Sequence, residues 1–131
     1  MDDITVTFPG NKRVDARVEG FTLRMDQPEK DGGDGAHPTP SHLFFASLAA
    51  CSGYYALAFC QKRGIDTSKL SLSVRMDEDE KTHMVTAMDM RLTLPGEFPE
   101  KYRKAVVRAM GQCYVKKHLD QPPAITLSIA D

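Results

Sequence analysis

The sequence predicts a single α+β domain over residues 1–131, with the element order β-β-β-α-β-β-α-β. In four regions apolar and polar side chains alternate with a period of two, which is typical of half-buried strands. Two other regions are typical of helices. One is apolar nearly throughout, and the other repeats its apolar residues at three- and four-residue steps. A chain of 131 residues has the size of one domain.

The first alternating region, residues 4–25, predicts a three-stranded antiparallel meander. Two turn sequences, Pro9-Gly10-Asn11 and Glu19-Gly20, divide it into strands of hairpin length. A glycine-rich segment, residues 27–38, follows. Its glycine spacing is not that of a phosphate-binding loop, and its acidic side chains would repel phosphate, so we expect a flexible connector.

A long helix is predicted from Pro40 to about Arg63. Thr39 suits the N-cap, Pro40 the first helical position and Gly64 the stop. Residues 43–60 carry no charge and reach the length of a membrane span, but Ala, Ser, Gly and Tyr dominate them and no second span follows. We therefore expect a buried helix of a soluble protein, not a membrane protein. Because the helix is apolar nearly all round, we expect a second copy of the chain to cover its exposed face.

The next alternating regions predict two strands, at residues 70–76 and 84–94, joined by an acidic turn that we interpret as a solvated hairpin tip. A second helix is expected from about Pro99 to His118, with Cys113 on its apolar face. Pro122-Pro123 breaks the chain, and the alternation of Ile125, Leu127 and Ile129 predicts a last strand.

Charge and cysteine content narrow the function classes. The chain has 17 Lys and Arg against 18 Asp and Glu, so the charge that drives nucleic-acid binding is absent in bulk. Its 3 cysteines do not form a disulfide scaffold, and the acidic start Met1-Asp2-Asp3 is unlike a signal peptide. We expect a cytoplasmic protein, in which a cysteine pair is more often catalytic, redox-active or metal-bound than structural.

Cys51 and Cys113 lie on the two predicted helices, and packing through these faces would bring their thiols together. Cys60 falls on the opposite helix face from Cys51, and we interpret it as a small core residue. Neither CxxC nor HxxxH spacing occurs, so no metal or other cofactor is expected. A Cys-His hydrolase would need a histidine from elsewhere, because His42 faces away from Cys51 on one helix.

Two segments resemble a known family. Residues 40–51 resemble the Pro-x-x-Leu…Ala-x-Cys helix of the OsmC/Ohr superfamily, the osmotically inducible and organic hydroperoxide resistance proteins. Residues 112–117 resemble its second-cysteine motif, usually Cys-Pro-x-Ser, with Tyr114 here in place of the proline. The element order also fits, and the resemblance covers nearly the whole chain.

The resemblance implies an intertwined homodimer with two central helices packed back to back and two equivalent sites at the interface. It also implies thiol-dependent reduction of organic hydroperoxides. Cys51 would be the peroxidatic cysteine that becomes a sulfenic acid, and Cys113 the resolving cysteine that closes a disulfide. The implied partners are a peroxide substrate and a dithiol reductant that reopens the disulfide.

The residues around the cysteines depart from the family pattern. In the hydroperoxide reductases, an Arg from the first hairpin and a Glu directly after the helix-starting Pro complete the site. Here Ser41 follows Pro40, and Arg13 of the first hairpin is the candidate for the activating cation. These departures indicate a divergent OsmC-like branch. They leave open a non-enzymatic alternative, in which the protein binds a small apolar or thiol-containing ligand at the dimer interface. A structural or partner-binding module with an unreactive Cys51 is a further alternative.

Tyr54 and Tyr55 follow Cys51 by three and four residues, which is the spacing of neighbours on one helix face. We interpret one of them as lining the substrate pocket, although core packing is the simpler explanation. An apolar pocket would favour fatty or aromatic hydroperoxides over hydrogen peroxide.

Overall fold

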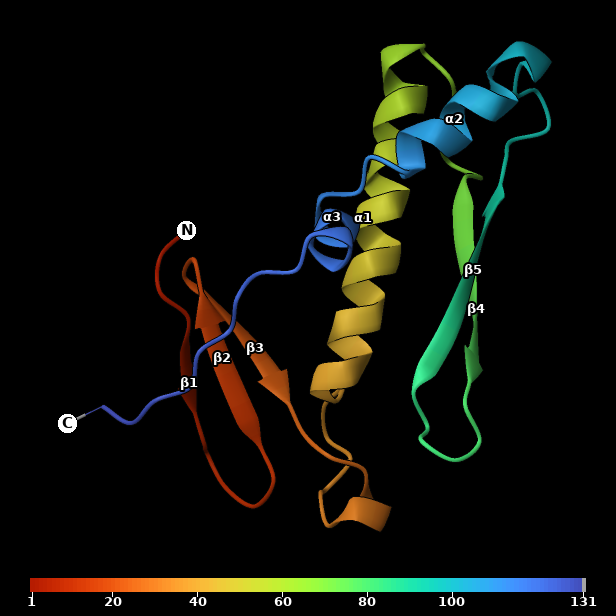
Figure 1. Cartoon of the computed structure of the whole chain (residues 1–131). Coiled ribbons are helices and arrows are strands. Elements are labelled where there is room, and N and C mark those ends of the chain that lie inside the picture. The colour runs from red at the N-terminus through yellow and green to blue at the C-terminus, as the bar shows by residue number, and fades with distance from the viewer. Residues whose placement is uncertain (131) are drawn as a thin grey trace. The chain divides into compact units, whose positions relative to one another are not determined.

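The computed structural model describes residues 1–130 and divides the chain into two compact units, Met1–Ala46 and Ser47–Asp131. Its elements are mixed α and β, which confirms the predicted fold class (Figure 1). Each unit is described by itself. The prediction that residues 1–131 form one domain stays a prediction.

The first unit contains the expected antiparallel meander of β1 (Thr5–Thr7), β2 (Val14–Val18) and β3 (Phe21–Met25). Val6 pairs with Ala16, and Ala16 with Leu23, across the three strands. Glu19 and Gly20 both have positive φ, at 48° and 81°. This left-handed pair matches the twist of a two-residue hairpin turn and sets the register of β2 against β3.

The segment after β3 is not the flexible connector predicted from its composition. It contains a short 3₁₀ turn, η1 (Glu29–Asp31), and folds back on the buried carboxylate of Asp26. That carboxylate accepts backbone N–H groups of Gln27 at 2.7 Å, Ala36 at 3.1 Å and Asp34 at 3.3 Å. Sequence composition missed this order because one acidic side chain, buried among backbone donors, holds the loop.

Helix α1 (Pro40–Lys62) begins and ends as predicted, within a residue. The Oγ1 of Thr39 accepts the N–H of His42 at 3.1 Å, while the Nδ1 of His42 accepts the N–H of Thr39 at 3.2 Å. The two residues thus form a reciprocal cap in which histidine takes the position usual for Glu or Gln. Gly64, with a φ of 65°, lies just beyond the helix end.

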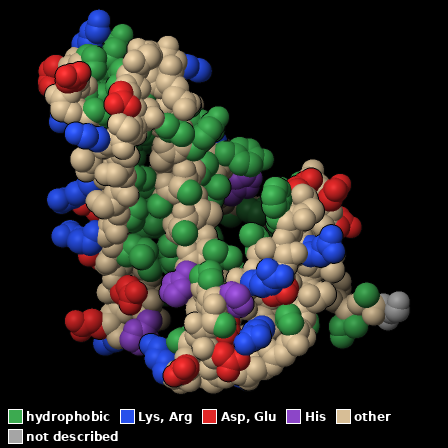
Figure 2. Space-filling view, turned by 180° about the vertical axis from the view of Figure 1, so that it is seen from behind, with side chains coloured by type: hydrophobic (Ala, Val, Ile, Leu, Met, Phe, Trp, Pro, Cys, Tyr) green, Lys and Arg blue, Asp and Glu red, His purple; other side chains and the backbone are tan. Residues whose placement is uncertain are grey.

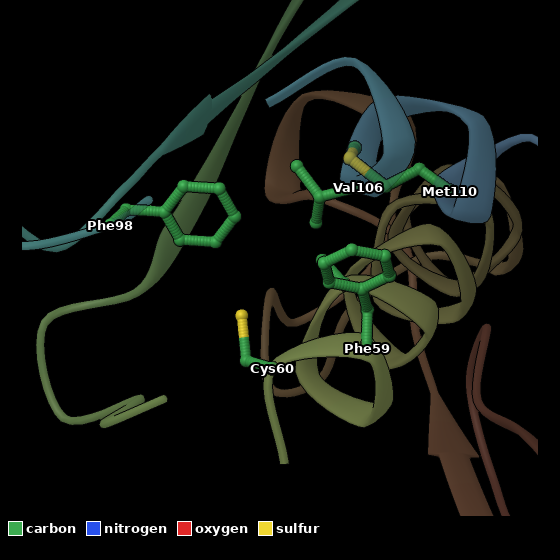
Figure 3. Packing of buried hydrophobic residues seen from close by; sticks show 6 residues of the cluster. Phe59, Cys60, Phe98, Val106 and Met110 are labelled. Atoms are coloured by element: carbon green, nitrogen blue, oxygen red, sulfur yellow. The ribbon is translucent and has the colours of Figure 1, made fainter. Parts of the chain in front are cut away.

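In the second unit, β4 (Ser71–Glu78) and β5 (Val85–Thr93) form an antiparallel hairpin. A 3₁₀ turn, η2 (Glu100–Tyr102), leads into α2 (Arg103–Met110), and α3 (Tyr114–Asp120) follows. The core contains six buried residues from α1, α2 and the segment before η2: Ala56, Phe59, Cys60, Phe98, Val106 and Met110. The strands pack against it through partly buried residues such as Leu72, Met90 and Leu92. Figure 3 shows Phe59, Phe98 and Val106 pointing toward one another, with the thiol of Cys60 facing the same space.

Two predicted elements differ from the structure. The second helix, expected over 99–118, is broken between Met110 and Tyr114, since Gly111 disfavours a continuous helix and Cys113 leaves helical geometry. The last strand, expected at 125–129, is absent among residues 1–130, and Ile125, Leu127 and Ile129 are almost fully exposed. An extended segment becomes a strand only by pairing with an edge, and no strand in the described part of the chain bonds to it.

Many apolar side chains lie on the surface, as the green patches of Figure 2 show. Only 28% of the most apolar stretch of α1 is buried. By length and composition α1 is apolar enough to cross a membrane, a test that central helices of soluble proteins also pass.

Candidate active site

The break between α2 and α3 places Cys113 at the N-cap of α3. With φ at −46° and ψ at 117°, the backbone of Cys113 turns away from α2, and its side chain is fully buried. The sulfur accepts the backbone N–H of Lys116 at 3.3 Å. Because the chain turns at this point, Cys113 is an N-cap residue of α3 rather than a residue within one long helix, and its sulfur accepts a backbone hydrogen bond.

Cys51 and Cys113 are brought together, as the sequence predicts for their helices. The Cys51 thiol is close enough to Cys113 to lower the pKa of Cys113, and both cysteines are free thiols. Cys51 is partly exposed in the middle of α1, whereas Cys113 is fully buried. A peroxide would therefore reach Cys51 more easily than Cys113, which fits the order of reaction that the family resemblance implies.

Two opposing effects set the pKa of Cys113. Burial raises the pKa, but the Lys116 N–H, the Cys51 thiol, the Ser52 hydroxyl and the Val115 N–H all favour the thiolate. The hydrogen bonds outweigh the burial, and the pKa of Cys113 is lowered from its ordinary value. A lowered pKa increases the fraction of Cys113 that is thiolate, which is the reactive form of a cysteine.

Ser52 is a site residue that the sequence reasoning missed. It is 3% exposed, and its hydroxyl is among the groups that lower the pKa of Cys113. Burying a hydroxyl without a polar partner lowers the stability of the fold. The proximity of Cys113 therefore accounts for a serine at this buried position of α1. The available signal was a polar residue directly after Cys51, on a helix whose buried face is otherwise apolar.

Cys60 has the core position that the sequence predicts. It is fully buried among apolar side chains, and burial raises the pKa of its thiol, although Arg63 opposes this. A buried thiol with a raised pKa is a poor nucleophile. Cys60 is therefore a poor candidate for redox chemistry, and Cys51 and Cys113 are the candidate pair.

Arg13 belongs to the first unit, where its guanidinium pairs with Asp34 at 3.3 Å. The neighbouring Asn11 donates to the carbonyl of Gly32 at 3.0 Å, so the first hairpin is tied to the loop around Asp26. Backbone hydrogen bonds, chiefly from Ala36, hold the pKa of Asp26 below 3.8, and the charge of Arg13 adds to this effect. The charge of Arg13 is therefore engaged with two carboxylates, and its role toward Cys51 stays a prediction.

The other predicted site residues lie on α1. Ser41 is in the first turn, exposed, with its hydroxyl 3.0 Å from that of Thr39. Tyr54 is 61% exposed and Tyr55 is half-buried, and their rings meet edge to face at 5.4 Å. Their contribution to substrate binding stays a prediction.

Within residues 1–130, no group of three or more His, Cys, Asp or Glu side chains is arranged to hold a metal ion.

Comparison with known proteins decides the family. A family model described as OsmC-like protein matches residues 32–128, most of the chain. The chain belongs to the OsmC-like family. No curated protein matches it.

Solved structures that are less than 25% identical to this chain share its fold. A Psychrobacter arcticus protein named for osmotic stress and detoxification responses has a TM-score of 0.74 at 23% identity, over 89% of this chain and 87% of its own. An OsmC-like protein from Mycoplasma pneumoniae has a TM-score of 0.70 at 17% identity, over 92% of this chain and 87% of its own. An organic hydroperoxide resistance protein from Legionella pneumophila has a TM-score of 0.52 at 16% identity, over 89% and 87%. The OsmC-like fold is that of a soluble domain, which favours a buried role for α1 over a membrane span.

Proposed function

We propose that this OsmC-like protein reduces organic hydroperoxides through Cys51 and Cys113. The observation that carries the proposal is a pair of neighbouring free thiols: Cys51 is partly exposed, and Cys113 is buried with a lowered pKa. Membership of the OsmC-like family and a structural neighbour named as a hydroperoxide resistance protein also support the proposal.

The chemistry balances with a dithiol as the external reductant. The Cys51 thiolate attacks the outer oxygen of the peroxide, the O–O bond breaks, and an alcohol leaves after taking up a proton. The resulting sulfenic acid of Cys51 is attacked by the Cys113 sulfur, which forms a disulfide and releases water. A dithiol then reopens this disulfide by exchange and is itself oxidised.

We further propose that the working form is a cytoplasmic homodimer. The exposed part of α1 and the exposed Tyr54 ring supply an apolar surface that a second copy would cover. The paired rings of Tyr54 and Tyr55 add aromatic surface to α1 near Cys51 in the sequence, so we expect bulky apolar peroxides to be better substrates than hydrogen peroxide. Equal second-order rate constants for cumene hydroperoxide and hydrogen peroxide would contradict this preference.

The test of the function is steady-state peroxide consumption with a dithiol supplied in excess. We expect the wild type to turn over cumene hydroperoxide, and Cys51→Ser and Cys113→Ser each to abolish dithiol-dependent turnover. Cys60→Ala is the matched control, since Cys60 is a core thiol outside the pair. Turnover at the wild-type rate in Cys51→Ser would contradict the proposal. Absence of turnover in the wild type would favour the ligand-binding alternative.

A further inference from the structure

A groove lies between the end of β5 and helix α2, and all of it belongs to the second unit. Its apolar lining is aliphatic. Leu92 and Leu94 come from the end of β5 and the residue after it, and Val106 and Val107 come from α2. Val106 is fully buried in the core, whereas Val107 is 62% exposed. The volume of the groove is about 490 Å³, which is in the range of small-molecule sites.

The charged residues that line this groove are all cationic. They are Arg103, Lys104 and Arg108, and no described acidic residue lines the groove beside them. Arg103 and Lys104 precede Val107 by four and three residues, so both are its neighbours on the surface of α2. Arg108 is a neighbour of Lys104 by the same rule. The groove therefore combines an aliphatic surface with positive charge.

The positions of these cations are unfavourable in the protein alone. Arg103 and Lys104 lie in the first turn of α2, which has no acidic residue, and the helix dipole disfavours positive charge there. Lys104 and Arg108 are four residues apart, and like charges at this spacing repel each other. Arg103 has a counter-ion in Glu100 at 3.6 Å. Among residues 1–130, neither Lys104 nor Arg108 forms an ion pair, so a bound anion would offset both unfavourable effects.

We propose that this groove binds a single-chain amphiphile with an anionic headgroup, of which a long-chain carboxylate is the simplest example. Lys104 and Arg108 bind the headgroup, because charge-assisted hydrogen bonds to a carboxylate are the strong ones. The alkyl chain lies on the aliphatic lining. This inference does not depend on the proposed redox function.

The lining favours this class of ligand over a macromolecule. Protein interfaces are enriched in Tyr, Trp and Phe at their centre, and the described lining of the groove has none of them. A helix that inserts into a membrane surface needs a wide apolar face. The exposed large apolar side chain of α2 is Val107 alone among the described residues, which is too little for such a face.

The test is a titration of the reduced full chain with dodecanoate below its critical micelle concentration. Binding is followed by NMR of labelled leucine and valine methyl groups, and we expect saturable shifts at Val107, Leu92 and Leu94. Dodecanol has the chain without the charge, and acetate has the charge without the chain, so both should bind at least about tenfold more weakly. Cys51→Ser should bind dodecanoate as the wild type does, so a failure of the proposed function leaves this test intact.

Four results would overturn the inference. The first is no saturable shift with dodecanoate, and the second is equal affinity for dodecanoate and dodecanol. The third is a shift only with vesicles of anionic phospholipid, which would indicate a membrane surface as the ligand. The fourth is a shift of Val107 that depends on protein concentration without any probe, which would show that a second copy covers the groove.

Substitutions on the protein surface locate the site. Lys104→Gln combined with Arg108→Gln should weaken dodecanoate binding about tenfold. The matched control combines Lys81→Gln with Lys117→Gln, which removes the same charge at exposed positions outside the groove and should leave the affinity unchanged. Val107→Ser should weaken binding about threefold or more, with circular dichroism showing that the variant is folded. An equal loss of affinity in the two double variants would show that net charge alone acts and would contradict a built site.

Discussion

Gly33 is the position at which the loop around Asp26 is most sensitive to a single methyl group. A Cβ at this residue would overlap the carbonyl oxygen of Gln27, and it would lie 2.5 Å from that carbonyl carbon and 2.9 Å from Oδ1 of Asp26. Neither backbone atom belongs to a flexible side chain, so the loop must open in Gly33→Ala.

The expected loss of stability in Gly33→Ala can be worked out from the two backbone hydrogen bonds that close this loop. The Gly35 N–H donates to the Gln27 carbonyl at 3.0 Å, and the Gly33 N–H donates to the Pro28 carbonyl at 3.1 Å. At about 0.5–1.5 kcal/mol each, their loss lowers the free energy of unfolding by about 1–3 kcal/mol. For a domain of this size the melting temperature should fall by roughly 3–15 °C.

The assay is urea unfolding of Gly33→Ala beside Gly10→Ala. A Cβ at Gly10 meets nothing within 4 Å, so this control should stay within about 0.5 kcal/mol of wild type. Chemical shifts of Arg13 should also move in Gly33→Ala, because its partner Asp34 is in the same loop. If both variants are equally stable, the loop is not held as described, and the flexible connector predicted from composition is the better description.

Three further perturbations test the packing, the helix cap and the buried carboxylate. Val106→Ala removes two carbons from a fully buried core position and should cost about 2–3 kcal/mol in urea unfolding; a cost below about 0.5 kcal/mol would contradict the core assignment. Thr39→Ala loses the cap of α1 and should cost about 1 kcal/mol, with Thr39→Ser close to wild type. The lowered pKa of Asp26 stabilises the fold above pH 3.8, and this stabilisation is lost as pH falls through the folded-state pKa. The stability difference between wild type and Asp26→Asn should therefore shrink in acid; a constant difference would contradict the linkage.

Much of the fold could be predicted from sequence because local signals agree with it. The alternation in residues 4–25, the Glu19-Gly20 turn and the Thr39-Pro40 start of α1 each fix a local geometry, and the structure has these elements in these places. Local signals were not enough for the strand predicted at residues 125–129, which the structure does not have. Its alternation is strand-like, but pairing depends on an edge elsewhere, which sequence spacing does not specify.

The two cysteines of the candidate site could be predicted from the sequence, but the groups around them could not. The helix positions of Cys51 and Cys113 were enough to predict that their thiols meet. The donors to Cys113 were not predictable, since they arise from the break at Gly111, which makes the Lys116 N–H available at the start of α3. Ser52 was missed because its position after Cys51 shows only a polar residue on an apolar helix, and its effect on Cys113 depends on tertiary packing.

The central claim is that Cys51 and Cys113 form a redox couple, and a stoichiometric titration tests it most directly. Reduced protein is titrated with cumene hydroperoxide while free thiols and intact mass are measured together. The account predicts that both thiols are lost, that the chain loses the mass of two hydrogen atoms, and that peptide mapping finds a Cys51–Cys113 disulfide which Cys51→Ser cannot form. Unchanged thiols at a modest excess of peroxide would contradict the account and show that the pair is not redox-active toward this class of substrate.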